Sequence, residues 1–181
     1  MANWYDNDLT VYGPKVEVER FIGSVKTKDS LLAFEELFPP PSELQIPSDD
    51  ITNAWVSDNP REASDRINRL IEWEETNWGC GRGTCDAELK GLRYYATYAL
   101  ASYYFRTKWS PPRGFFHWAA QEFRNLTFHL KYGEYCMDHR GEAIWQKGEL
   151  VHQCDRCQFE GVDYFTVSEE PEEESIDELP F

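Results

Sequence analysis

The sequence predicts an α+β protein in which helices pack on a sheet, and three patterns lead to this class. Residues Asn7–Gly13 alternate apolar and polar side chains, as a half-buried strand does. Gly13-Pro14 then ends this strand, and apolar residues recur at helical spacing over Lys15–Lys26, which predicts an amphipathic helix. Leu126–Tyr132 alternates in the same way as the first segment, which predicts a later strand.

Capping and turn residues predict two further helices and a hairpin. Asn59-Pro60 is typical of a helix cap followed by a first-turn proline, and an apolar stripe continues from it as far as Trp78. Ser110-Pro111-Pro112 opens another helix. The turn at Lys147-Gly148 predicts a C-terminal hairpin, whose strands would be Glu142–Trp145 and Glu149–Gln153.

The sequence indicates the secondary structure of three further segments less directly. Asn77–Thr84 has three glycines in five residues, and because it lacks the ending of a phosphate-binding loop, a tight turn is favoured over an anion cradle. Leu89–Trp109 combines apolar residues at helical spacing with the tyrosine and threonine content of a strand, so propensity decides for neither. Pro39-Pro40-Pro41 predicts a Pro-rich surface excursion over about 38–59.

The composition predicts one domain with an acidic surface. Among 181 residues, 33 Asp and Glu oppose 18 Lys and Arg, a formal net charge of −15, while 41% hydrophobic residues suffice for a core. This charge opposes binding to nucleic-acid phosphates and to anionic membranes, so the expected partners are basic protein surfaces or metal ions. We expect a single domain over 1–167, with a cysteine-containing segment at 151–167, and a disordered acidic tail at 168–181.

The start of the chain and its cysteines indicate a reducing compartment. Met1–Thr10 lacks the basic start and apolar centre of a signal peptide, and no apolar run reaches the length of a membrane helix, so a cytoplasmic location is expected. Five cysteines cannot all pair within one chain. Free thiols or metal ligands are therefore favoured over a disulfide framework.

Several segments, in a fixed order along the chain, resemble those of the YubB/Api-like family of phage and plasmid proteins, whose function is unassigned. They are the Met-Ala-Asn-Trp opening with its Leu-x-Val-x-Gly strand, Phe34–Leu44, Asn77-Trp78-Gly79, Trp109-Ser110-Pro111-Pro112, and Leu126–Tyr132 followed by Glu134, Met137-Asp138 and Gly141. The resemblance covers about 1–150. It implies a ferredoxin-like antiparallel sheet with helices on one face and mainly strand over Leu89–Trp109, and it implies a location in the cytoplasm of the host cell.

Two zinc sites are considered from the cysteine spacing, although free thiols remain the favoured interpretation. Two-residue knuckles at each end of the predicted hairpin could bind one tetrahedral zinc through Cys136, His139, Cys154 and Cys157. The alternative ligand set is Cys80, Cys85, Cys154 and Cys157. Either site would be structural, because protein side chains would fill all four positions.

The favoured function is a non-enzymatic acidic interaction protein that binds a basic site on a host protein. A specific version is a counter-defence inhibitor, anti-CRISPR or anti-restriction, whose carboxylates mimic DNA phosphates. The acids expected to contact the partner are Asp49, Asp50, Glu62, Glu72, Glu74, Glu75, Glu169 and Glu170. The alternative is a zinc-stabilised module that binds a ligand or a nucleic-acid end.

Two other function classes are less favoured by the sequence. Aromatic residues of Tyr94–Phe105 could stack bases if they shared one sheet face, but direct nucleic-acid binding conflicts with the overall charge. An enzyme built on a Cys–His pair would need an activating loop that the sequence does not show.

Overall fold

Alternating burial along the strands gives the sheet one covered face. The computed structural model describes residues 3–46, 60–134 and 139–156, in which six antiparallel strands have the order β2-β3-β1-β4-β5-β6. Odd-numbered residues of β1 and β3 are buried, and even-numbered residues are partly exposed. The strands are β1 (Trp4–Pro14), β2 (Gly81–Tyr94), β3 (Tyr98–Lys108), β4 (Thr127–Glu134), β5 (His139–Gln146) and β6 (Glu149–Asp155).

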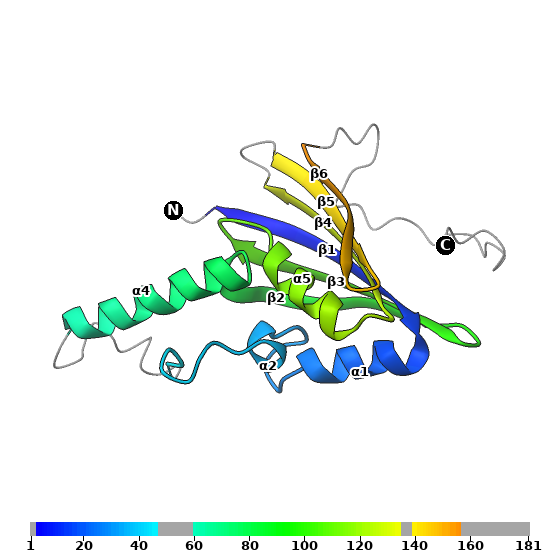
Figure 1. The fold of residues 1–181 in the computed structure, drawn as a ribbon, viewed down its shortest axis with the longest axis horizontal. Coiled ribbons are helices and arrows are strands. Elements are labelled where there is room, and N and C mark those ends of the chain that lie inside the picture. Colours follow the sequence, from blue (N-terminus) through cyan, green and yellow to red (C-terminus); the bar gives the residue numbers. More distant parts are fainter. Residues whose placement is uncertain (1–2, 47–59, 135–138, 157–181) are drawn as a thin grey trace.

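The helices lie together on the covered face (Figure 1). Helix α1 packs on β1 and β3, α2 and α4 pack on β2, and α5 packs on β4, β5 and β6. The order β1-α1-β2-β3-α5-β4 is that of the ferredoxin-like fold, and β5 and β6 extend one edge of its sheet. The helices are α1 (Lys15–Val25), α2 (Phe34–Leu37), α4 (Pro60–Asn77) and α5 (Arg113–Glu122).

A cluster of aromatic rings joins the helices to the sheet. The Phe34 ring stacks on the Phe115 ring with 3.9 Å between centroids. The Trp78 side chain is 2% exposed, and its Nε1 donates a 3.0 Å hydrogen bond to the Phe38 carbonyl.

The backbone at the start of α5 lies directly against the backbone at the end of α4. A Cβ at Gly114 would lie 2.4 Å from the Asn77 carbonyl oxygen, so only glycine allows this approach.

The first part of the Pro-rich segment is packed against the domain. The Phe38 ring stacks on Trp118 with 4.6 Å between centroids and meets Trp73 edge-on, and Pro40 is buried. Phe38 and Pro40 therefore anchor the start of the segment, while Pro39, Ser42, Glu43 and Gln45 are exposed. Residues 47–59 of the predicted excursion lie outside the described residues.

The predicted fold class is confirmed, with local adjustments. The strand, helix and hairpin predictions are each confirmed, and Leu89–Trp109 consists of the end of β2, a turn and β3. Strand pairing supplies the long-range contacts that local propensity could not reveal. In Asn77–Thr84 the predicted turn is confined to the residues before Gly81, where β2 already begins. The tail at 168–181 and residues 157–167 lie outside the described residues.

We expect Tyr103→Phe to stabilise the protein. Tyr103 is 2% exposed and its hydroxyl has no hydrogen-bond partner in the described structure, so burial raises the pKa of Tyr103 to about 12. Removing this hydroxyl should raise the free energy of unfolding by about 1 kcal/mol in urea denaturation. Tyr132→Phe is the matched control, because the Tyr132 hydroxyl donates a 2.5 Å bond to Asp155, and it should cost about 1.5 kcal/mol. A free energy of unfolding that is lower for Tyr103→Phe than for the parent would contradict this interpretation.

Candidate functional site

The acids predicted to contact a partner are only partly on the described surface. Glu62, Glu72 and Glu75 lie exposed on α4. Arg61, Arg66 and Arg69 are interleaved with them on the same helix, so α4 does not present a surface of one sign. Four of the predicted acids lie outside the described residues, namely Asp49, Asp50, Glu169 and Glu170.

The prediction that Glu74 is exposed to solvent is wrong, because its side chain is buried. Its exposed fraction is 6%, and one carboxylate oxygen accepts a 2.6 Å hydrogen bond from the Arg82 backbone N–H. Glu74 is four residues from both Leu70 and Trp78, which are buried, and residues four apart share one face of a helix. The spacing in the sequence could therefore have placed Glu74 on the packed side of α4. Burial raises the pKa of the Glu74 carboxyl and outweighs the opposing effect of the Arg82 hydrogen bond.

The negative charge of the chain is concentrated outside the described domain. All 18 Lys and Arg residues lie in the described ranges, together with 20 of the 33 Asp and Glu residues, so these ranges carry 18 minus 20, a formal charge of −2. The other 13 acidic residues lie at 47–59, 135–138 and 157–181, where there is no Lys or Arg. The predicted acidic surface is therefore not a property of the folded sheet and its helices.

On the uncovered face of the sheet, charges are paired across strands. The strand register places six side chains in one row, namely Glu88, Tyr104, Asp8, Lys131, Glu142 and Cys154. Along β3, Tyr104 donates a 2.5 Å hydrogen bond to Asp6, and Arg106 forms an ion pair with Asp86. Burial raises the pKa of the Asp8 carboxyl despite the nearby Lys131 ammonium. These cross-strand pairs leave this face without a strong field of one sign.

Glu142 is the most connected carboxylate of this face. His129 Nε2 lies 2.9 Å from one of its oxygens, and His152 Nε2 lies 3.2 Å from the other. Burial alone would raise the pKa of the Glu142 carboxyl, but the His129 hydrogen bond and nearby cationic groups outweigh it, so the net pKa is lowered. Because the two imidazoles contact opposite oxygens, the trio forms a bridge from β4 through β5 to β6.

The zinc predictions are not supported by the placement of their residues. His139 shares the covered face with Tyr5, whose hydroxyl lies 2.9 Å from His139 Nδ1, whereas Cys154 is paired with Glu142 on the uncovered face. His139 and Cys154 therefore point to opposite sides of the sheet. Cys154 is also disulfide-bonded, so the free thiol or metal ligand favoured from the sequence is wrong for this residue, and its sulfur is not a thiolate ligand. Cys136 and Cys157 lie outside the described residues.

The alternative zinc set fails for a different reason. Cys80 and Cys85 lie at and near the start of β2, at one edge of the sheet, while Cys154 lies on β6 at the other edge, about 24 Å away at the usual strand spacing. Cys80 is buried in the core, which raises the pKa of its thiol. Within 3–46, 60–134 and 139–156, no group of three or more His, Cys, Asp or Glu side chains is arranged to hold a metal ion.

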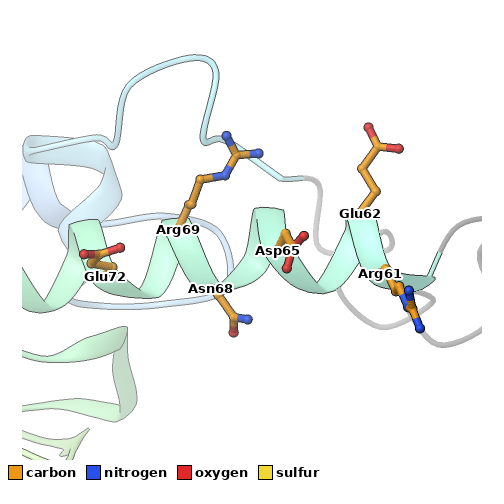
Figure 2. Close-up of a pocket in the computed structure, with 6 residues that line it drawn as sticks. All are labelled: Arg61, Glu62, Asp65, Asn68, Arg69 and Glu72. Atoms are coloured by element: carbon orange, nitrogen blue, oxygen red, sulfur yellow. The ribbon is translucent and has the colours of Figure 1, made fainter.

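A shallow hollow on α4 does not form a binding site. Its lining consists of six helix residues, namely Arg61, Glu62, Asp65, Asn68, Arg69 and Glu72. Figure 2 shows that these side chains leave α4 in different directions and converge on no common point. The hollow therefore lacks the convergent polar groups of a ligand pocket.

No helix in the described ranges is long and apolar enough to cross a membrane.

The tyrosines considered for base stacking do not share one surface. Tyr103 and Phe105 are buried in the core, and Tyr104 bonds to Asp6 on the uncovered face. Tyr94, Tyr95 and Tyr98 are about half exposed around the turn between β2 and β3. This separation argues against a continuous platform for bases.

The comparisons with known proteins confirm the family resemblance for part of the chain. Residues 94–176 match the family described as a ferredoxin-like domain in Api92-like protein. The crystal structure of protein api92 from Yersinia pseudotuberculosis matches with a TM-score of 0.49 and 10% sequence identity, covering 88% of this chain and 99% of that one. None of the curated proteins matches. The matched range extends beyond residue 150, whereas the resemblance found from the sequence covers only about 1–150.

We expect Glu74→Gln to stabilise the protein at pH 7. The pKa of the Glu74 carboxyl is higher in the folded protein than its ordinary value of 4.5, so its ionised form destabilises the folded state. This destabilisation disappears as the pH falls through the folded pKa toward 4.5. Glutamine removes the buried charge and keeps an acceptor for the Arg82 N–H. In urea denaturation the variant should be more stable than the parent at pH 7, and the difference should shrink toward pH 4.5.

Glu75→Gln is the control for this experiment, since Glu75 is the exposed neighbour of Glu74 on the same helix. It should change the free energy of unfolding little at either pH. A Glu74→Gln variant that is less stable than the parent at pH 7 would contradict the assigned cost of burial.

Proposed function

We propose that this chain, whose residues 94–176 match the ferredoxin-like domain of Api92-like proteins, is a non-enzymatic interaction protein that binds a basic site on a host protein. The description of the matched family names a domain and no activity. In its more specific form, the proposal is that the acidic segments occupy a site where a nucleic-acid-handling defence protein binds phosphates. The chain would then act as a counter-defence inhibitor.

The observation that supports this proposal is the distribution of charge. The described ranges carry a formal charge of −2, whereas residues 157–181 contain nine acidic residues and no Lys or Arg. Seven of these nine acids fall within 168–181. A dense run of carboxylates attracts a basic surface over a Debye length and selects against acidic partners.

The folded domain offers weaker candidates for the same contact. On α4 three arginines, Arg61, Arg66 and Arg69, share the helix with the exposed acids, and on the uncovered face Glu142 is already bonded to His129 and His152. Charges that are paired within a protein contribute little field at a distance. The proposal therefore assigns partner binding to the acidic segments 47–59 and 157–181, and not to α4.

The proposal is tested by pulldown from host lysate with the full chain, followed by affinity measurements on the captured partner. The partner should be a basic protein, and its affinity should fall at least about tenfold as salt rises from about 50 mM to about 500 mM. A charge-neutral tail should weaken binding by a similar factor at low salt, because it removes the attracting carboxylates without shortening the chain. That variant is E169Q/E170Q/E172Q/E173Q/E174Q/D177N/E178Q.

The matched control replaces the exposed acids of α4 in the variant E62Q/E72Q/E75Q. This variant should bind the partner within about twofold of the parent, because the proposal places the contact in the acidic segments and not on α4. Binding that is insensitive to salt, or that is lost in the α4 variant and kept in the tail variant, would contradict the proposal.

A further inference from the structure

Exposed apolar side chains gather at one end of the sheet. Among the described residues, seven large hydrophobic side chains are strongly exposed, and four of them lie where the turn between β2 and β3 meets the start of α1. Figure 1 shows this turn projecting past the start of α1. The four are Val16 (73% exposed), Tyr94 (51%), Tyr95 (48%) and Tyr98 (45%). We call this group, together with Lys15 and Arg93, the tyrosine tip.

Backbone contacts hold the tyrosine tip in place. The Lys15 backbone N–H donates a 3.0 Å hydrogen bond to the Thr97 carbonyl, and the Tyr95 N–H donates a 2.8 Å bond to the Tyr98 carbonyl. Strand β3 begins at Tyr98, which pairs with Pro14. The turn is therefore fixed to both β1 and α1, and its rings are presented on a supported backbone rather than on a free loop.

The charge of the tyrosine tip is opposite to that of the acidic segments. The tip carries two cations, Lys15 and Arg93, and the first carboxylate beyond it on α1, Glu17, is paired with Arg20 at 2.9 Å. At the tip itself, the Lys15 ammonium lies over the Tyr94 ring at 4.8 Å from its centroid, and Arg93 is exposed. A surface of tyrosines bordered by these cations is complementary to apolar surface bordered by carboxylates.

The rings of the tyrosine tip point to both faces of the hairpin. Tyr94 pairs with Ala99, a buried residue of the covered face, and directly paired residues share a face. Tyr98 precedes Ala99 in the same strand and therefore points to the opposite face. Rings on opposite faces cannot stack successive bases of one nucleic-acid strand, but they can fill a concave site that encloses the turn.

We infer that the tyrosine tip is a second interaction surface, which inserts into a concave, carboxylate-rimmed site on a partner protein. Tyrosine and arginine are the side chains that most often dominate the energetics of protein interfaces, and tyrosine loses little conformational entropy on binding. This surface is distinct from the acidic segments of the proposed function. Its charge has the opposite sign, so the two surfaces do not compete for one site.

The inference is tested by photocrosslinking from the tip of the full chain. The variant Tyr95→benzoylphenylalanine is irradiated in bacterial host lysate, and the crosslinked peptides are identified by mass spectrometry. We expect a crosslink to a partner protein at apolar residues with Asp or Glu close by. Adding Lys15→Glu and Arg93→Glu to the same variant should lower the crosslink yield at least about tenfold, because both cations then repel the rim.

The control carries the same crosslinker at Trp109, an aromatic residue of similar exposure (45%) just beyond the far end of β3. Crosslinks to nucleic acid, to a second copy or to the acidic tail would overturn the inference. So would a yield no higher than that of the Trp109 control, or a yield that charge reversal leaves unchanged. The charge-neutral tail variant should keep the Tyr95 crosslink, so failure here is distinguishable from failure of the proposed function.

Discussion

The organisation of this protein depends on a sheet that is covered by helices on one face only. Burial of the covered face fixes the register, because a shift of one residue would turn Leu9 and Phe105 toward solvent. The uncovered face must then satisfy its polar groups with one another. It does so across strands, as in the bridge formed by His129, Glu142 and His152.

Most of the excess negative charge lies outside the residues that the structure describes. The described ranges are nearly balanced, the segments outside them are strongly acidic, and the tyrosine tip is basic. Under the proposed function, the acidic segments and the tyrosine tip contact partners, and the sheet supports the tip. Figure 1 shows the turn that carries the tyrosine tip at the end of the sheet and the helices along its covered face.

Local patterns in the sequence were sufficient for most helices and strands, but not for the candidate site. Glu74 was expected in solvent because it stands in a run of charges, although its spacing from Trp78 places it on the packed stripe of α4. The cysteine spacing could not reveal that Cys80 and Cys154 belong to opposite edges of the sheet, because strand order is a long-range property. The run of acids at 168–181, in contrast, is evident from the sequence alone.

The central proposal is that the acidic segments 47–59 and 157–181, and not α4 or the uncovered sheet face, recognise a basic partner. Its most direct test is an NMR titration of the full chain with a lysine-rich decapeptide at low salt. We expect chemical-shift changes in 47–59 and 157–181, while the amides of α4 and of the uncovered sheet face stay unchanged. Changes centred on α4 or on the strands around Glu142, with the acidic segments unaffected, would contradict the proposal.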